Sequence, residues 1–176
     1  MEFSLIAAVD KDFGIGKKNG IPWRLPEDTR HFAEVTTTVK QPGKMNADVM
    51  GSRPWESLPL PHRPLRNRLN IVLSRDKNLN LPEGVILCKS LEEAMEIVEQ
   101  NTAIENVFII GGGKVYEEAI KNPKCHAIFL TQLNQSFDCD TFFPRIDAAK
   151  FRLKERSEIK KNNGLEFEFL LYEKTG

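Results

Sequence analysis

The sequence predicts an α/β fold, a single domain whose predominantly parallel sheet ends in an antiparallel hairpin. Short apolar runs rich in Val, Ile and Phe alternate with helical patterns up to about residue 120, which is typical of parallel strands buried on both faces by helices. After His126 strand-like runs dominate. The length of 176 residues, with 40% apolar and 28% charged residues, suits one sizeable core.

Buried strands are expected wherever a short apolar run lacks helical spacing. Five such runs precede residue 111: Phe3–Val9, a weaker run at Ala47–Gly51, Ile71–Leu73, Val85–Cys88 and Val107–Ile110. Three more strands are expected near the end of the chain, over Ala127–Leu133, Phe151–Ile159 and the alternating stretch Leu165–Leu171. The turn signal Asn162-Asn163-Gly164 joins the last two into an antiparallel hairpin.

Helices are expected between the strands. One begins at Pro26, a favourable first-turn residue, and extends to about Val35. Another begins at Pro54 and lasts only one or two turns, because Pro59, Pro61 and Pro64 follow. The clearest helix covers Leu91–Gln100, with apolar residues on one face and a capping box before it, and the last covers Lys114–Ile120.

The composition excludes several classes of function. The 25 basic and 25 acidic residues give a formal net charge of zero, so nucleic acid and anionic membranes are not expected partners. Three widely spaced cysteines indicate neither a disulfide framework nor a metal site. The first residues, Met1 to Val9, lack a basic segment and are too short for a signal peptide or membrane helix, so we expect a cytoplasmic protein.

Two glycine-rich segments are candidates for phosphate binding. The segment Gly14–Gly20 misses the dinucleotide-binding spacing and leads to no helix, so a flexible turn is the simpler interpretation. Gly111-Gly112-Gly113 joins a buried strand to the helix near Lys114, where backbone N–H groups can approach a pyrophosphate. A Walker A loop is excluded because Val115 follows the lysine. Tight packing of strand on helix explains the three glycines equally well.

Charged residues stand out at two places. On a helical period Asp28 shares the core-facing stripe with Phe32, whereas Glu27 points elsewhere. A carboxylate on that side needs a polar or cationic partner or a ligand, although a simple cap or ion pair near the helix start is an equal alternative. The segment Arg53–Arg75 contains five arginines against one acid, Glu56; arginine suits carboxylates and phosphates.

These features together resemble dihydrofolate reductase over essentially the whole chain. The matching pieces, in order, are Ala7-Ala8-Val9, Gly14-Ile15-Gly16, Ile21 to Asp28 with Phe32, Met50-Gly51, Trp55-Glu56-Ser57, Arg63-Pro64-Leu65, Arg68 to Arg75, Ile110 to Gly113 with Val115-Tyr116, Leu130-Thr131, and Asp138 to Pro144.

The resemblance implies one domain over residues 1–176, with an eight-stranded sheet and about four helices on both faces. It implies reduction of 7,8-dihydrofolate to tetrahydrofolate in one-carbon metabolism, with NADPH giving a hydride from nicotinamide C4 to pterin C6 and a proton reaching N5. It further implies a cytoplasmic monomer, inhibition by antifolates, and no metal.

The resemblance also assigns roles to residues. Asp28 would bind the pterin amino group and ring nitrogen, supported by Thr131 and by a water near Trp23, and Ile21 completes the implied catalytic set. Arg68 would bind the folate α-carboxylate. The pterin and nicotinamide pocket would be lined by Ile6, Ala8, Ile21, Phe32, Leu58, Leu65, Ile110 and Tyr116.

For the cofactor, the resemblance implies a nicotinamide end against Ala8, Ile15 and Gly16, with the loop Gly14 to Trp23 acting as a lid. The pyrophosphate side would be formed by Gly111, Gly112, Gly113, Lys114, Val115 and Pro54, with a cis peptide between Gly111 and Gly112. The adenosine 2′-phosphate would lie near Arg53, Ser74, Arg75 and Lys89, which favours NADPH over NADH.

The chain departs from the family pattern at three positions. Ser52 and Pro54 replace a basic residue and a threonine on the cofactor side, and Asp48 interrupts a strand that is otherwise apolar. We expect weakened NADPH affinity. These departures leave open a non-catalytic folate- or nucleotide-binding paralogue, and a related pteridine or flavin-pathway reductase is a further alternative. Arg68 favours a substrate with a glutamate tail.

Overall fold

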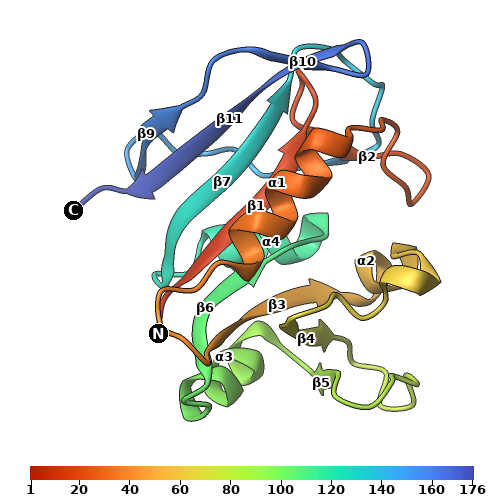
Figure 1. Ribbon diagram of the computed structural model, residues 1–176, viewed down its shortest axis with the longest axis vertical. Helices are drawn as coiled ribbons and strands as arrows, with labels where there is room; N and C mark the ends of the chain where they lie inside the picture. Colours follow the sequence, from red (N-terminus) through yellow and green to blue (C-terminus); the bar gives the residue numbers. More distant parts are fainter.

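The computed structural model describes all residues, 1–176, as a twisted sheet with helices on both faces (Figure 1). Its strands run in the order β10-β11-β7-β1-β6-β3-β4-β5, and β9 pairs beside β10 on the outer edge of β11, so nine strands form a sheet eight positions wide. Their bounds are β1 Phe3–Val9, β3 Met45–Gly51, β4 Arg68–Leu73, β5 Ile86–Cys88, β6 Ile104–Ile109, β7 Cys125–Leu133, β9 Phe151–Arg156, β10 Lys160–Asn162 and β11 Leu165–Lys174.

The sheet confirms the predicted division into parallel and antiparallel parts. Strands β7, β1, β6, β3, β4 and β5 are parallel to one another, whereas β11 is antiparallel to β7, β9 and β10. The four helices are α1 Pro26–Thr37, α2 Ser52–Ser57, α3 Leu91–Gln100 and α4 Gly113–Ile120, with a 3-10 turn, η1, at Leu60–His62. None of them is long and apolar enough to cross a membrane.

The two faces of β3 show how the helices are distributed. Ala47 and Val49 belong to the main core, together with buried residues of α3 and α4. Alternate residues of a strand point to opposite faces, and Asn46 accordingly bonds the carbonyl oxygen of Thr36 at the end of α1. Thus α1 covers one face, which Figure 1 shows in front of β1 and β7, while α3 and α4 cover the other.

Three local details differ from the predictions. The strand expected over Phe151–Ile159 is interrupted, because residues 157–159 form a bulge opposite Glu168 and Phe169 before pairing resumes at Lys160. The short helix begins at Ser52, so Pro54 is its third residue. The segment Gly14–Gly16 is not only a turn: as β2 it pairs with β8, Thr141–Phe142, which was not expected.

Candidate active site

One stripe of α1 faces the sheet and marks the length of the site. Asp28, Phe32 and Thr36 are spaced by four residues, so they share a helix face. Asp28 contacts Thr131 on β7, whereas Thr36 contacts Arg68 on β4. The two polar ends are eight residues apart on the helix, roughly 12 Å at 1.5 Å per residue. Phe32 lies between them.

The first polar end is the Asp28 carboxylate. Thr131 Oγ1 donates a 2.6 Å hydrogen bond to Asp28 Oδ1, and no protein group hydrogen-bonds Oδ2. Burial raises the pKa of Asp28, and the Thr131 hydrogen bond offsets part of that rise. The prediction that Asp28 faces the sheet is therefore confirmed, and its free oxygen is available to a ligand.

The floor of the site is formed by β1, β7 and the residues after β6. Ala8 pairs with Thr131 in the register of β1 and β7, and Ile6 pairs with Phe129 two residues earlier. The Tyr116 hydroxyl donates a 2.6 Å hydrogen bond to the carbonyl oxygen of Ile6. Burial, with a smaller effect of Asp28, raises the pKa of Tyr116, so this side chain is a neutral hydrogen-bond donor at physiological pH.

An apolar wall is formed by the segment between α2 and β4. Leu58 and Leu65 pack with Ile110 around the cluster of Met50, Trp55 and Val72. The amide of Asn70 bonds both the N–H and the carbonyl oxygen of Leu65, at 2.9 Å each. Asn70 therefore fixes the position of Leu65, a role that no local sequence pattern indicates.

The second polar end is the guanidinium of Arg68. Its Nη1 donates to Thr36 Oγ1 at 3.0 Å and its Nε to the carbonyl oxygen of Arg66 at 2.8 Å, while its Cζ lies 5.9 Å from the centre of the Phe32 ring. Nη2 makes no hydrogen bond within the protein. Asp48 Oδ2 lies 3.6 Å from Nη1. Sequence reasoning did not select Thr36, because a threonine inside a helix is usually a surface or packing residue.

The N-terminal ends of α2 and α4 lie close together. The N–H of Gly51, at the start of α2, donates to the carbonyl oxygen of Gly111 at 2.8 Å, and Gly112 is the N-cap of α4. No side chain caps either helix, so their first N–H groups remain available to an anion. A Cβ added at Gly112 would lie 3.4 Å from Pro54 Cγ. The Gly111–Gly112 peptide bond is cis, as the resemblance implies.

Cationic side chains follow the ends of three neighbouring strands. Arg53 lies in α2 directly after β3, Ser74 and Arg75 follow β4, and Lys89 follows β5. The register pairs Gly51 with Leu73 and Leu73 with Cys88, and the N–H of Ser74 bonds the carbonyl oxygen of Cys88 at 2.9 Å. Carboxyl ends of parallel strands form a common edge, which brings these predicted phosphate ligands to one side of the molecule.

Asp10 organises the loop after β1 and was missed by the sequence analysis. Its Oδ1 accepts hydrogen bonds from the N–H groups of Asp12 and Gly14 at 2.8 and 2.7 Å, and its Oδ2 accepts from Phe137 at 2.9 Å. Burial would raise the pKa of Asp10, but these donors and the Cys139 thiol lower it overall. Its position directly after a buried strand is the feature of the sequence that could have indicated this role.

The loop from Gly14 to Trp23 lies between Asp10 and α1. Ile15 and Thr141 approach the start of α4, where a Cβ on Gly113 would lie 3.9 Å from Ile15 Cδ1 and 3.0 Å from Thr141 Cγ2. Ile15 of β2 therefore lies near the glycine turn, and Gly16 lies beside Thr141. Ile21 is 66% exposed, so it contacts little of the pocket. Trp23 packs on Phe137, with ring centres 5.3 Å apart.

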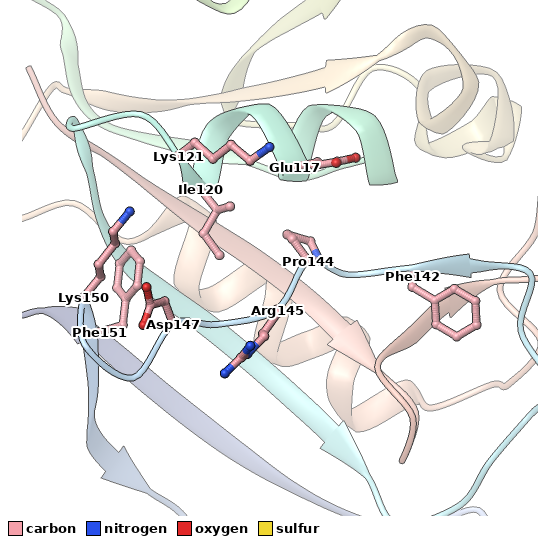
Figure 2. Close-up of a pocket in the computed structure, with 9 residues that line it drawn as sticks. All are labelled: Glu117, Ile120, Lys121, Phe142, Pro144, Arg145, Asp147, Lys150 and Phe151. Atoms are coloured by element: carbon pink, nitrogen blue, oxygen red, sulfur yellow. The ribbon is translucent and has the colours of Figure 1, made fainter.

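A separate hollow of about 340 Å³ lies beside the C-terminal part of α4 (Figure 2). Its walls come from the end of α4 and from the segment between β8 and β9. Its lining contains none of the predicted site residues, and it mixes three cations with two acids: Lys121, Arg145, Lys150, Glu117 and Asp147. This surface hollow is therefore distinct from the site beneath α1.

Comparison with known proteins agrees with this arrangement. The sequence model of the family described as dihydrofolate reductase matches residues 2–174. The chain is 42% identical over 179 residues to the dihydrofolate reductase of Drosophila melanogaster, covering 99% of this chain and 98% of that protein. The corresponding values for the dihydrofolate reductase of Heliothis virescens are 41% over 162 residues, 90% and 88%.

The architecture agrees as well. The solved structure of Schistosoma mansoni dihydrofolate reductase matches with a TM-score of 0.87 and 35% identity, covering 98% of both chains. Sequence, strand order and the sheet-facing carboxylate of α1 thus lead to one assignment. This chain belongs to the dihydrofolate reductase family.

Proposed function

We propose that residues 1–176 act as one catalytic unit that reduces 7,8-dihydrofolate to 5,6,7,8-tetrahydrofolate with NADPH. The family assignment supports dihydrofolate reduction and a nicotinamide cofactor. The choice of NADPH, the site residues and the monomeric state are proposals based on the geometry and on the resemblance. The same holds for a cytoplasmic location, for which the three free cysteines are the supporting observation.

The Asp28 carboxylate is the observation that carries the proposal. It is a partly buried acid of α1 that faces the sheet, one of its oxygens is held by Thr131, and the other has no protein partner. A cationic or donor-rich ring that presents two N–H groups can use that free oxygen and share the other. The 2-amino group and adjacent ring nitrogen of a pterin present such a pair.

The two polar ends of the α1 stripe fix the direction in which the substrate would lie. A pterin bound at Asp28 directs its glutamate tail along Phe32 toward Arg68, roughly 12 Å away along the helix at 1.5 Å per residue. Arg68 is held by two neutral acceptors with Nη2 free, so it is preorganised to bind a carboxylate. Ile6, Ala8, Ile110, Leu58 and Leu65 would cover the apolar middle of the ligand.

The glycine turn and the cations at the strand ends fit the cofactor. The uncapped starts of α2 and α4 offer N–H groups to a pyrophosphate, and Arg53, Arg75 and Lys89 offer charge to a 2′-phosphate. When bound, the nicotinamide ring supplies the hydride for C6. The protein aligns the pterin, excludes bulk water with the loop from Gly14 to Trp23, and stabilises the protonated ring through Asp28.

The proton for N5 would arrive through water. Asp28 binds the opposite edge of the pterin, so it raises the basicity of the ring system without touching N5. Neutral Tyr116 and the apolar floor keep the surroundings of the ring dry, which strengthens the interaction of Asp28 with the ring. Asp28 is thus the catalytic residue of the proposal, and Thr131 positions it.

A spectrophotometric assay tests the proposal. NADPH oxidation is followed at saturating dihydrofolate, in parallel with NADH and with methotrexate as inhibitor. We expect methotrexate-sensitive turnover, with kcat/KM at least 10-fold higher for NADPH than for NADH, since one hydrogen bond to a charged group contributes about 1.5 kcal/mol. Binding of methotrexate without any turnover would contradict catalysis.

A further inference from the structure

The Asp48 carboxylate is a buried acid that the proposed reaction does not use. Asp48 lies on β3, is 0% exposed, and neither of its oxygens accepts a hydrogen bond. Its nearest cationic group is Arg68 on the neighbouring strand, with Oδ2 3.6 Å from Nη1. A buried charge without hydrogen bonds is costly, so the charge of Asp48 depends on this one guanidinium.

Arg68 is oriented by other groups. Its Nη1 bonds Thr36 Oγ1 and its Nε bonds the carbonyl oxygen of Arg66, both neutral acceptors. Asp48 therefore acts on Arg68 through charge and does not set its geometry. Nη2 remains without a protein partner, and the side chain retains 8% exposure, which leaves room for an incoming anion.

No second charged side chain faces Asp48. From β4 it is flanked by Arg68 and by Asn70, whose amide is bonded to Leu65 and to the carbonyl oxygen of Arg68. From β6 its register partner is Phe108, and α1 presents Phe32 and Thr36 on this side. The charged residues of α1 on either side of Phe32, which are Arg30 and Glu34, are exposed.

A ligand carboxylate that binds Arg68 changes the electrostatic interaction between Arg68 and Asp48. It neutralises the guanidinium that stabilises ionised Asp48, and it adds a second negative charge nearby. Burial raises the pKa of Asp48 to about 7, and Arg68 acts in the opposite direction, so loss of the attraction to Arg68 raises that pKa further. Near neutral pH, binding of the carboxylate therefore favours the protonated form of Asp48.

We propose that Asp48 is an internal counter-ion of Arg68, and that a ligand carboxylate displaces it, whereupon the ionised fraction of Asp48 takes up a proton. The inference rests on the proposed function, because it requires the folate tail to reach Arg68. Asp48 would be a specificity-determining residue, since at alkaline pH it weakens binding of ligands that carry a carboxylate and leaves ligands without one unaffected. The proton balances: the carboxylate of Asp48 becomes a carboxylic acid, and solvent supplies the proton.

Calorimetry on the full chain tests the proposal with two ligands. Folate carries the glutamate carboxylates, and trimethoprim, a diaminopyrimidine, carries none. Each is titrated between pH 6 and pH 8 in buffers of different ionisation enthalpy, into the unmodified protein and into Asp48→Asn. Protonation of the ligand ring contributes equally in both proteins, so their difference isolates Asp48.

We expect folate affinity of the unmodified protein, relative to Asp48→Asn, to fall about 10-fold from pH 6 to pH 8, with about half a proton more taken up at pH 7. Trimethoprim should show no difference between the two proteins. As a readout independent of the variant, the folate-bound infrared difference spectrum of protein labelled with ¹³C-aspartate should gain the C=O stretch of a protonated acid.

Two results would overturn the inference. Equal proton uptake with folate in both proteins, or an unchanged infrared spectrum, would show that Asp48 does not respond to the ligand carboxylate, while turnover of dihydrofolate would leave the proposed function intact. Absence of both folate binding and dihydrofolate turnover would overturn the proposed function together with the inference.

Discussion

Thr131 on β7 donates a 2.6 Å hydrogen bond to Oδ1 of Asp28 in the first turn of α1. The contact joins residues 103 positions apart in the sequence and leaves Oδ2 without a hydrogen-bond partner in the protein. It fixes the orientation of the carboxylate on which the proposed chemistry depends, and the first two predictions follow from it.

The variant Asp28→Asn should fold and lose most of its turnover. Because burial raises the pKa of Asp28, the ionised form costs stability above that pKa, so an uncharged amide should be at least as stable at neutral pH. We expect kcat at pH 7 to fall roughly 100-fold to 1,000-fold, the usual loss when one group that stabilises charge in the transition state is removed, with partial recovery at lower pH, where dihydrofolate is already protonated. Glu34→Gln, on the exposed face of α1, is the matched control. Full activity of Asp28→Asn at neutral pH would contradict its assigned role.

Replacing Thr131 by Val should move the pH profile toward higher pH. The Thr131 hydroxyl lowers the pKa of Asp28, so its removal lets burial raise that pKa further. The pKa seen in the pH dependence of kcat/KM should increase in Thr131→Val and return toward the original value in Thr131→Ser, which keeps the hydroxyl. An unchanged profile in the valine variant would mean that this hydrogen bond has no part in the titration of the site.

Gly14→Ala should loosen the loop that approaches the cofactor side. An added Cβ would lie 2.4 Å from Cβ and 2.5 Å from Sγ of Cys139, and such overpacking costs about 1–3 kcal/mol. The melting temperature should fall and KM for NADPH should rise, and Cys139→Gly in the same chain should relieve part of both effects, because the added Cβ would also lie 3.0 Å from Asp10 Oδ1. Gly20→Ala is the control, because its nearest contact would be an ordinary 3.8 Å. A Gly14→Ala variant that matches this control would contradict the contact.

Arg75→Gln should reduce the preference for NADPH. Arg75 follows β4 beside the ends of β3 and β5, where the 2′-phosphate is proposed to bind. Loss of a hydrogen bond to a charged group costs about 1.5 kcal/mol, so KM for NADPH should rise about 10-fold while KM for NADH stays the same. Lys77→Gln, at another exposed cation of this loop, should change neither value. If both cofactors are affected equally, the 2′-phosphate is bound elsewhere.

Asp48 should make the protein less stable as the pH rises. Its pKa is raised to about 7 in the folded protein, well above that of an unfolded aspartate. Between these values the folded state binds the extra proton, so the free energy of unfolding decreases with pH, by about 2 kcal/mol from pH 5 to pH 7. Urea unfolding of the unmodified protein against Asp48→Asn should show that difference. Parallel pH dependence of the two proteins would mean that Asp48 titrates normally.

Periodicity predicted the parts of this protein whose structure is decided locally. The capping box before α3 is one case: Ser90 accepts the N–H of Glu93 at 3.1 Å, although the Glu93 carboxylate bonds the N–H of Lys89 and not that of Ser90. Helical spacing likewise placed Asp28 on the face of α1 that meets the sheet. Each of these depends on neighbours within one or two helical turns.

Local sequence patterns could not predict which distant residues contact these side chains. Thr131 entered only through the resemblance, and nothing near Asp10 in the sequence indicates that Phe137 and Cys139 complete its set of donors. Asp48 was noticed only as a break in an apolar strand. A hydrogen bond or an ion pair needs two groups in contact, and spacing along the chain describes only one of them.

By itself the sequence determined the α/β class, the succession of strands and helices, and the direction in which Asp28 points, because side-chain burial repeats with the period of each element. Only the tertiary structure decided that β3 lies between β6 and β4, and hence that Asp48 meets Arg68 and that Arg68 meets Thr36. Strand order and register result from packing of the whole sheet, and the two ends of the site exist only once that packing is complete.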